Sequence, residues 1–567
     1  MTTTRQKVKA PIVRSSRTFP VIVVGAGQAG LSVSHELTAL GIDHVVLERA
    51  RIGQTWRDLW DSFCLVTPNW TLSLPGAPYA GDHPEGFAPR DEIVRYLERY
   101  ASSFGAPIRE GVAVNSLEPG SNGGLLLRTS AGDMQAESVV VCTGAFQRPH
   151  RPDAAAGFPP EVVVIDAEDY HNPAALAPGK VLVVGSGQTG CQISEELHES
   201  GRDVYLACGR APWAPRRANG SDIVTWLKQT TFLETPLSAL PSPAARLAAN
   251  LQTTGHRGGH DLHYRTLQAM GVQLLGRLTG VQGHRAYFAD DLADSVAFGD
   301  ARYADLRQLL TEQLPAKGMA VPELPDPPPF HTDPPRELKL KGIGAVILTS
   351  GFRPDYAHWI RFPAFDATGF PLTDNGASMV VPGLFFCGVH FLRKRKSGFL
   401  VGVGEDATIV ARSMPAIDHT TARPAPEHHD AAGAQGPSVA GCPPQRSAWT
   451  RASGASKGGS SAQSSITCRG HPYRALAASA VRTGVARSWR PQTRVVAAVI
   501  RARSSGGIGG PPKCPIKTPR ASTVCGCWVP TTSMSCTPAT PWLDGGEKLV
   551  ISLVPPSGCW ALSTPTL

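Results

Sequence analysis

The hydrophobic residues of this chain gather in short continuous runs, and glycine-rich turns follow several of them. The first such unit spans residues 19–50, FPVIVVGAGQAGLSVSHELTALGIDHVVLERA. Residues 21–24 form an unbroken apolar run, which is typical of a parallel strand buried on both faces. Residues 31–40 have helical spacing, and Gly41 ends that segment. The pattern therefore predicts a strand, a glycine turn, a helix and a second strand.

The same pattern occurs a second time in residues 180–210, KVLVVGSGQTGCQISEELHESGRDVYLACGR. The two glycine turns begin at Gly25 and at Gly185. The rest of the pattern predicts a helix over residues 91–101, buried strands within 138–146, 342–356 and 383–391, and a last helix that ends at Met414.

The first glycine turn has the composition of a dinucleotide-binding site. Gly25, Gly27 and Gly30 follow a strand and open a helix, which permits a tight turn, close approach of a pyrophosphate and close packing of helix on strand. Glu48 stands at the end of the next strand. A carboxylate there accepts hydrogen bonds from both ribose hydroxyls, so an unphosphorylated ribose, as in FAD or NAD, is predicted.

The second turn repeats the glycines as Gly185, Gly187 and Gly190, but its next strand ends without an acidic residue. Arg210 stands there instead, and a guanidinium binds a 2′-phosphate through charge-assisted hydrogen bonds. NADPH is therefore predicted at this site, where Arg216 and Arg217 either assist or are ordinary basic loop residues. Two dinucleotide sites in one chain indicate hydride transfer from NADPH to FAD.

Charge divides the chain into two unlike parts. The whole chain of 567 residues has a net charge of +9, but residues 421–567 hold 16 Lys and Arg against 4 Asp and Glu, and the first 420 hold the remaining 39 and 42. The body is thus slightly acidic, which argues against nucleic acid as its partner. The tail is rich in Ser, Pro, Gly, Ala and Arg and has no helical or strand period. We expect it to be disordered or translated out of frame, with a basic arm for nucleic acid or an anionic surface as the alternative.

These patterns predict an α/β fold with two Rossmann-like domains, in which an NADPH-binding domain is inserted into an FAD-binding domain. The predicted parts are a flexible arm (1–17), the FAD-binding domain (18–155 and 340–414), the NADPH-binding domain (156–339) and the basic tail (415–567).

Cysteine usage and hydropathy suggest the compartment. Five cysteines are scattered through the body without any CxxC pair, which suits a reducing environment and disfavours a redox dithiol. No apolar run of about 18 residues is present, so we expect a cytoplasmic protein without a membrane partner. Self-association into a homo-oligomer is left open by the sequence.

The motifs together resemble the flavin-containing monooxygenase-like proteins, in the branch of the bacterial FAD-dependent oxidoreductases and the YUCCA-type indole-pyruvate monooxygenases. The resemblance covers residues 18–414. It rests on both glycine turns and on the following segments: LERA, IGQTWRDLWDSFCLVTP (52–68), VVVCTGAFQRP (139–149), TSGFRPD (349–355), and GLFFCGVHF through KSGFLVGVGEDA (383–407).

The resemblance implies roles for residues outside the glycine turns. Glu48 would hold the FAD ribose, and Trp56 and Arg57 would line the flavin, although Trp56 is equally typical of a core aromatic. Asn69 would lie beside the reactive flavin edge as the catalytic residue, with a plain turn asparagine as the alternative. The remaining implied positions are the domain crossing at Thr143 and Gly144, and the closure over the flavin by Gly388 and Asp406.

The resemblance also implies a reaction. NADPH would reduce FAD, and O₂ would then form a C4a-peroxyflavin that oxygenates a small organic substrate. One departure disfavours oxygenation, because the family fingerprint FxGxxxHxxxY/F is matched only by residues 161–170, with Asp166 in the place of histidine and Tyr170 retained. The alternatives are an NADPH-dependent flavin reductase or oxidase without oxygen insertion, and a nucleotide-binding protein without catalysis.

Two further features of the sequence could carry chemistry. His256, His260 and His263 have a spacing that fits one helix face and a metal, but the glycines among them disfavour a helix, and no metal site is predicted. Cys191 stands at a helix start, where a thiolate is favoured electrostatically, yet a small packing residue explains it better.

Overall fold

The computed structural model describes residues 17–120, 123–331 and 333–414. The predicted arm (1–17) and tail (415–567) lie outside this part, apart from Arg17, which opens the first strand. None of the helices in the described part combines the length and the apolar character needed to cross a bilayer.

The first sheet contains the first glycine-turn unit. Its nine strands are β1 (Arg17–Val24), β2 (His44–Leu47), β3 (Ile108–Arg109), β4 (Val114–Pro119), β5 (Leu125–Thr129), β6 (Gly132–Val141), β19 (Thr373–Asp374), β20 (Ala377–Ser378) and β21 (Leu384–Phe386). The path runs β19-β20-β21-β6-β1-β2-β3, with β5 paired to β6 and β4 paired to β5. β1 pairs in parallel with β2 and β6, so Val23 stands opposite Val46 and Val140. The buried parallel strand predicted at residues 21–24 is confirmed.

The second sheet contains the second unit and is wholly parallel. Its strands are β8 (Val164–Asp166), β9 (Lys180–Val184), β10 (Val204–Ala207), β13 (Gln273–Leu275) and β17 (Ile343–Leu348), in the order β13-β10-β9-β17-β8. Smaller antiparallel sheets are formed by β14 (Leu278–Gln282), β15 (Arg285–Phe288) and β16 (Glu337–Lys339), by β11 (Arg217–Ala218) and β12 (Ser221–Asp222), and by β7 (Arg148–Pro149) and β18 (Phe352–Arg353).

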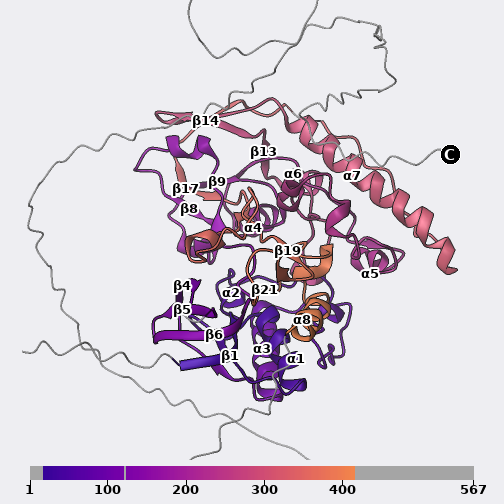
Figure 1. Cartoon of the computed structure of the whole chain (residues 1–567). Coiled ribbons are helices and arrows are strands. Elements are labelled where there is room, and N and C mark those ends of the chain that lie inside the picture. The colour runs from indigo at the N-terminus through magenta and orange to yellow at the C-terminus, as the bar shows by residue number, and fades with distance from the viewer. Residues whose placement is uncertain (1–16, 121–122, 332, 415–567) are drawn as a thin grey trace, which may run out of the picture. The chain divides into compact units, whose positions relative to one another are not determined.

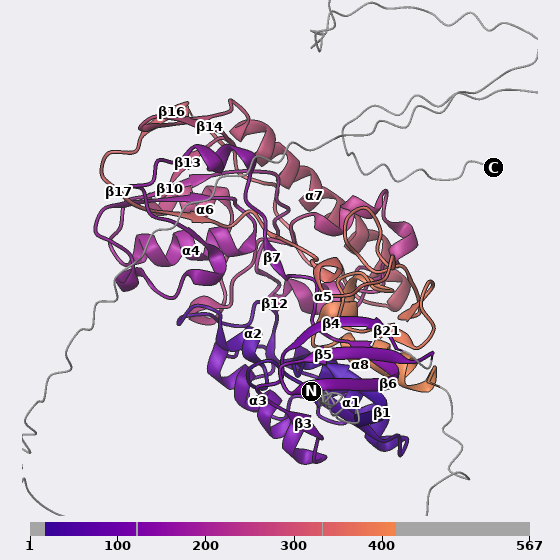
Figure 2. The ribbon, with the colours of Figure 1, turned by 60° about the vertical axis from the view of Figure 1, so that its left-hand side comes forward.

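Helices accompany both sheets (Figures 1 and 2). The α-helices are α1 (Gln28–Ala39), α2 (Gln54–Arg57), α3 (Arg90–Ser103), α4 (Gln188–Glu199), α5 (Ile223–Lys228), α6 (Tyr264–Met270), α7 (Leu292–Gln313) and α8 (Val403–Arg412). The 3₁₀ turns are η1 (Asn69–Thr71), η2 (Asp153–Gly157), η3 (Ala167–Asp169), η4 (Pro173–Ala175), η5 (Leu237–Ala239), η6 (Pro243–Leu247), η7 (His256–Gly258), η8 (Pro315–Lys317), η9 (Tyr356–His358) and η10 (Arg395–Gly398). α1 and α8 pack together beside the first sheet (Figure 2).

The predicted domain boundary at residue 340 is wrong. β17 pairs with β9 and β8 and therefore belongs to the second sheet, not to the FAD-binding part assigned to residues 340–414. The apolar run that forms β17 is compatible with either parallel sheet, so the sequence pattern alone does not select one. The chain leaves the second sheet only after β17, and β18 then pairs with β7, so the outgoing and returning connections lie side by side.

A buried ion pair, Arg216–Asp222, lies against the loop that precedes α3. The Arg216 and Asp222 side chains are each 1% exposed, and their charged atoms are 2.5 Å apart. Arg216 also donates to the backbone oxygen of Val66 at 2.9 Å, and its guanidinium lies 4.4 Å from the ring centroid of Phe87. Burial lowers the pKa of Arg216 and raises that of Asp222. The pair therefore joins the segment after β10 to the loop between α2 and α3.

We predict that Asp222→Asn lowers the free energy of unfolding by about 3 kcal/mol, because it leaves the Arg216 guanidinium buried without a counter-charge. An asparagine oxygen can still accept from the N–H of Val224, as Asp222 does at 2.8 Å, so the cap of α5 is retained. Urea denaturation measures the effect. The matched control is Asp305→Asn, which removes an exposed partner of Arg302 and should change stability by about 0.5 kcal/mol or less. Equal effects of the two changes would contradict a special role for the buried pair.

Candidate functional site

Each glycine turn begins with a glycine in a backbone conformation that other residues rarely adopt. The φ angle is +105° at Gly25 and +109° at Gly185. A Cβ on Gly25 would lie 3.0 Å from the oxygen of Cys142, and one on Gly185 would lie 2.7 Å from the oxygen of Thr349. The first turn therefore lies against Cys142, which follows β6, and the second lies against Thr349, which follows β17.

The helices after the turns begin without side-chain caps. Gly27 and Gly187 are the N-cap residues of α1 and α4, neither makes a side-chain cap, and the first turns contain no acidic residue. Their leading backbone N–H groups and the positive end of the helix dipole are thus available to an anion. A Cβ on Gly27 would meet no atom within 4 Å, and one on Gly187 would meet only Ala249, at 4.0 Å. Both positions leave space for a ligand.

The third glycine of each turn lets the helix pack directly against the backbone of the turn. A Cβ on Gly30 would lie 1.8 Å from the Gly25 oxygen, and one on Gly190 would lie 2.0 Å from the Gly185 oxygen. No side chain fits at such distances. The two turns thus repeat one geometry, as the repeated sequence pattern predicts.

Glu48 lies where the sequence predicts it, at the end of β2 beside the first turn. Its side chain accepts hydrogen bonds from the backbone N–H groups of Ala26 and Ala50, both at 2.9 Å, and the residue is 8% exposed. These contacts fix the carboxylate next to the glycine turn.

The corresponding position of the second turn carries an exposed arginine, Arg210. The Gly209 N–H donates to Ser186 in the glycine turn at 2.8 Å, which places Arg210 beside that turn. Arg210 is exposed, its guanidinium lies 5.9 Å from the ring centroid of Phe298, and no carboxylate of the described residues pairs with it. It is available to a negatively charged ligand.

The glutamine inside each turn is a contact residue that the sequence analysis missed. Gln28 accepts from the Trp56 indole at 3.1 Å and donates to the Gly398 oxygen at 3.4 Å. Gln188 donates to the Thr253 hydroxyl at 2.7 Å. Both turns read GxGQxG, so the repetition of this glutamine was the available signal.

The two residues predicted on the flavin side have different surroundings. The structure places Trp56 against the first glycine turn through its hydrogen bond to Gln28. The Arg57 guanidinium instead donates to Glu98 on α3 at 2.5 Å and to the Ile52 oxygen at 3.1 Å. Arg57 therefore braces α2 against α3, and a contact with the flavin stays a prediction.

The predicted crossing between the two domains, at Thr143 and Gly144, receives hydrogen bonds from the side chains of two residues outside it. Gln147 donates to the Thr143 hydroxyl at 2.9 Å and to the Gly144 oxygen at 2.8 Å, and it accepts from the Asp355 N–H at 2.6 Å. The hydroxyl of Tyr356, which is fully buried, donates to the Gly144 oxygen at 2.6 Å. Gln147 and Tyr356 were not predicted, since their contacts join parts of the chain that are far apart in the sequence.

The C-terminal segment packs against α1, and closure over the flavin by Gly388 and Asp406 stays a prediction. A Cβ on Gly388, where φ is +75°, would lie 2.4 Å from the Cβ of Ala29. Asp406 in the first turn of α8 is 3% exposed and receives a hydrogen bond from Arg393 at 2.9 Å. Burial raises the pKa of Asp406, and its Oδ2 has no hydrogen-bond partner among the described residues.

The amide of Asn69 already has protein partners. It donates to the His83 oxygen at 3.0 Å and accepts from the Ala88 N–H at 2.6 Å, and the residue is 5% exposed. These bonds hold the loop of residues 79–88. The catalytic role of Asn69 therefore stays a prediction, and it requires this amide to change partners.

The departure from the monooxygenase fingerprint has a structural counterpart. Asp166 ends β8 and forms a two-point ion pair with Arg151, with distances of 3.0 Å and 2.7 Å to its Oδ2. Tyr170 is 1% exposed and donates to Glu196 on α4 at 2.8 Å. The fingerprint segment is thus part of the second sheet's framework.

The three histidines lie within residues 256–263 but have different partners. His256 pairs with Glu199 at 3.1 Å, His260 with Glu195, and His263 is the N-cap residue of α6. Within the described ranges, no group of three or more His, Cys, Asp and Glu side chains is arranged to hold a metal ion.

The structure pairs two cysteines that are distant in the sequence. Cys142 and Cys387 follow the adjacent parallel strands β6 and β21, and both are buried. A hydrogen bond that the Cys387 thiol donates to Cys142, together with burial, raises the pKa of Cys387 well above its ordinary value, so this thiol stays protonated. Cys191 is fully buried, and burial raises its pKa as well, which fits the packing interpretation.

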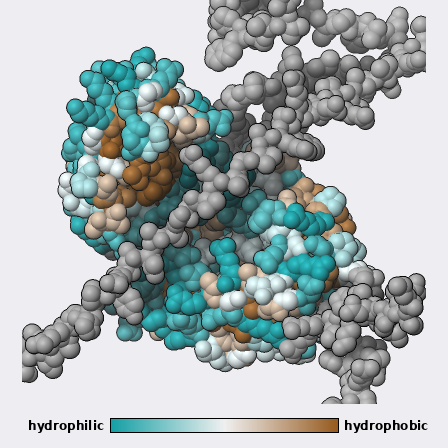
Figure 3. Space-filling model, turned by 90° about the vertical axis from the view of Figure 1, so that its left-hand side faces the viewer, coloured by the Kyte–Doolittle hydropathy of each residue, from teal (hydrophilic) through white to brown (hydrophobic). Residues whose placement is uncertain are grey.

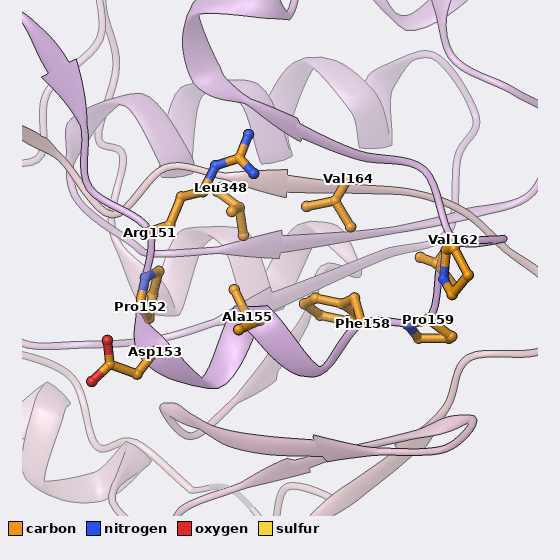
Figure 4. Close-up of a pocket in the computed structure, with 11 residues that line it drawn as sticks. Arg151, Pro152, Asp153, Ala155, Phe158, Pro159, Val162, Val164 and Leu348 are labelled. Atoms are coloured by element: carbon orange, nitrogen blue, oxygen red, sulfur yellow. The ribbon is translucent and has the colours of Figure 1, made fainter. Parts of the chain in front are cut away.

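A pocket of about 500 Å³ lies along β8 at the edge of the second sheet (Figure 4). Most of the residues that line it have apolar side chains: Pro152, Ala155, Ala156, Phe158, Pro159, Pro160, Val162, Val164 and Leu348, with Arg151 and Asp153 at one end. On the side of the molecule shown in Figure 3, hydrophobic residues form a surface patch that hydrophilic residues surround.

Comparisons with known proteins agree on an oxidoreductase. Residues 22–235 match the pyridine nucleotide-disulphide oxidoreductase family. A CzcO-like oxidoreductase of Geobacillus kaustophilus is 31% identical over 391 residues, which cover 68% of this chain and 95% of that protein. The indole-3-pyruvate monooxygenase YUCCA1 of Oryza sativa is 31% identical over 184 residues, or 32% of this chain and 45% of that protein.

The fold also has a solved counterpart. A flavin-containing monooxygenase from Stenotrophomonas maltophilia superposes with a TM-score of 0.50 at 19% identity, covering 70% of this chain and 98% of that one. This likeness confirms the predicted arrangement of Rossmann-like sheets.

We predict that Gly30→Ala lowers the stability of the ligand-free protein by about 3 kcal/mol or more, because the new Cβ would collide with the Gly25 oxygen. Gly27→Ala is the matched control. Its Cβ meets open space, so the loss should be about 1 kcal/mol or less. Thermal unfolding of both variants measures the difference, and equal losses would show that the close approach at Gly30 is not the constraint.

Proposed function

The chain belongs to the family of the CzcO-like oxidoreductases, and on that premise we propose that it binds FAD at the first glycine turn and NADPH at the second. The chain is therefore an oxidoreductase. The proposed activity is oxidation of NADPH coupled to the insertion of one oxygen atom of O₂ into a small organic substrate.

The observation that carries this proposal is the repeated anion site. Two helices in one body begin with uncapped N–H groups beside an open glycine, at Gly27 and Gly187, and each glycine turn lies at the carboxyl end of a parallel strand. Pyrophosphate fits such a position, because the backbone can approach it and the helix dipole favours negative charge. The residues present thus fit two dinucleotides.

The strand ends after the two turns support different ribose groups. Glu48 is held by Ala26 and Ala50 so that a carboxylate faces the first site, which suits free ribose hydroxyls and repels a phosphate. Arg210 at the second site is exposed and unpaired among the described residues, which suits a 2′-phosphate. This contrast supports FAD at the first turn and NADPH at the second.

Bound flavin would supply the hydride acceptor and the reaction with O₂. The chain's own residues bind and orient it: the turn at Gly25 holds the phosphates, Trp56 lies beside that turn, and Gly388 closes from the other side. Gln147 ties the crossing to Asp355, so the two sites stay connected through short hydrogen bonds.

Oxygen insertion is the finer part of the proposal, and the likeness to an indole-3-pyruvate monooxygenase supports it. A specific observation favours the alternative, an NADPH-dependent flavin reductase or oxidase. Asp166 replaces the fingerprint histidine, and its carboxylate is occupied by Arg151. We also propose a cytoplasmic location, because all five described cysteines are free thiols, which suits a reducing compartment.

We predict that Arg210→Gln lowers kcat/KM for NADPH in flavin reduction by about tenfold or more, while kcat/KM for NADH stays within about twofold. Stopped-flow reduction under anaerobic conditions gives both values. The matched control is Arg302→Gln, since Arg302 also lies over the Phe298 ring, at 5.5 Å, but its charge is paired with Asp305. Loss of both reactions in proportion would contradict the assignment of Arg210 to the 2′-phosphate.

The proposed function is tested by reducing the full-length holoenzyme with NADPH without oxygen, then mixing it rapidly with O₂ while the flavin spectrum is recorded. We expect a long-lived absorbance band that differs from oxidised flavin. Immediate return of the oxidised spectrum with release of peroxide, unchanged when organic acceptors are added, would favour the reductase or oxidase. Failure of NADPH to reduce the bound flavin would overturn the two-site proposal itself.

A further inference from the structure

The second glycine turn is joined to α6 by a closed cycle of hydrogen bonds. The Gly209 N–H donates to the Ser186 hydroxyl at 2.8 Å. The hydroxyl oxygens of Ser186 and Tyr264 are 2.6 Å apart, and Tyr264 donates to the backbone oxygen of Gly209 at 2.5 Å. The cycle therefore connects three places in the chain: the glycine turn, the segment that follows β10, and the first residue of α6.

The direction of each hydrogen bond in this cycle follows from its partners. A backbone oxygen can only accept, so the Tyr264 proton is donated to Gly209. The Ser186 hydroxyl accepts from the Gly209 N–H and donates its own proton to the Tyr264 oxygen, because its other acceptor, the Gly209 oxygen, is 3.4 Å away. All three donors and all three acceptors are thus satisfied, and the bonds of such a network strengthen one another.

The Tyr264 hydroxyl lies in an apolar core, where phenylalanine would avoid the burial of a polar group. Tyr264 is 4% exposed, Ser186 is 3% exposed, and the tyrosine ring packs in the same cluster as Cys191 and Cys208. A buried hydroxyl is costly unless it is hydrogen-bonded. Burial raises the pKa of Tyr264 well above its ordinary value, so the phenol stays neutral and keeps the proton that it donates to Gly209. The hydroxyl therefore serves the backbone of Gly209.

The residue that the cycle holds comes directly before Arg210. Gly209 has no side chain, and a Cβ there would meet no atom within 4 Å, so packing of a side chain does not fix it. Glycine also has the greatest backbone freedom of all residues. The hydrogen bonds at the Gly209 N–H and at its oxygen therefore restrict the backbone from which Arg210 extends.

The first glycine turn is held in a different way. Ala26 stands at the position that Ser186 has in the second turn, and its N–H donates to the Glu48 carboxylate at 2.9 Å. An acidic side chain thus holds the first turn. Ser186 and Tyr264 hold the second turn with neutral hydroxyls, which add no negative charge that would repel a phosphate. The two hydroxyls are therefore compatible with the role proposed for Arg210.

We propose that Tyr264 and Ser186 are positioning residues that hold Arg210 for the 2′-phosphate of NADPH and thereby determine the preference for NADPH over NADH. This inference rests on the proposed function and adds specificity-determining residues that act through Arg210. No carboxylate of the described residues pairs with Arg210, whose guanidinium lies 5.9 Å from the Phe298 ring centroid. A restricted backbone reduces the entropy that this side chain loses when it binds a ligand, so the cycle should strengthen binding of the 2′-phosphate.

The test measures binding, not turnover, on the full-length protein with oxidised FAD bound. Adenosine 2′,5′-bisphosphate and adenosine 5′-monophosphate differ only in the 2′-phosphate, and calorimetry gives both Kd values. We expect the wild type to bind the bisphosphate about tenfold or more tightly. Tyr264→Phe and Ser186→Ala should each reduce this ratio by about fivefold, the factor that corresponds to one lost hydrogen bond. Alanine fits the turn, since Ala26 occupies the same position in the first turn.

A double-variant comparison separates positioning from general damage to the fold. Arg210→Gln should bring the ratio near one, and adding Tyr264→Phe to that variant should cause no further decrease, because the hydroxyl acts through Arg210. The matched control is Tyr303→Phe. Tyr303 is also fully buried, but its hydroxyl donates to the Pro325 oxygen at 3.0 Å and not to either glycine turn. This variant should keep the wild-type ratio.

Several outcomes would overturn the positioning role. An unchanged ratio in both Tyr264→Phe and Ser186→Ala, or an equal loss of affinity for both ligands, would show that the hydroxyls only stabilise the fold. Equal affinity of the wild type for the two ligands would remove the preference that the role explains. Reduction of the wild-type flavin by NADPH is followed in parallel. If it proceeds while the variants keep the wild-type ratio, the positioning role fails and the two-site function stands. If it fails while the ratio falls in the variants as expected, the reverse holds.

Discussion

The constraint on which the rest of the structure depends is the contact between each glycine turn and the helix that follows it. The third glycine lies so close that a Cβ would be 1.8 Å from the Gly25 oxygen in one turn and 2.0 Å from the Gly185 oxygen in the other. Because no side chain fits there, each helix begins directly against its turn, and its leading N–H groups have no side-chain cap. The candidate binding residues Glu48, Trp56 and Arg210 lie beside these two turns.

The second level of organisation is the connection between the two sheets. The outgoing and returning strands β7 and β18 pair with each other, and Gln147 joins the two passages through Thr143 and Asp355. The first glycine turn lies against Cys142, where the chain leaves the first sheet, and the second lies against Thr349, where the chain leaves the second sheet. A substitution that disrupts the connection would therefore affect both turns. The buried Arg216–Asp222 pair then fixes the segment after β10 against the first part of the chain.

The local parts of this arrangement could be predicted from the sequence, and the non-local parts could not. Strand, turn and helix follow one another directly along the chain, so the apolar runs and the glycines identify them and place Glu48 and Arg210 at the strand ends. The sheet to which β17 belongs depends on partners in a distant part of the sequence, and its apolar run is equally compatible with both sheets. The neighbouring positions of Cys142 and Cys387 depend on the same kind of long-range pairing, between β6 and β21, which no spacing rule reveals.

Charge pairing separates the residues that hold the fold from those that remain free for a ligand. Arg57, Arg151, Arg216 and Arg393 each have a carboxylate partner and act as braces between segments. Arg210 and Arg395 have none among the described residues, and Arg246 has only one at 4.0 Å. Arg210 therefore remains available to the negative group of a ligand, whereas the paired arginines stabilise contacts between segments of the fold.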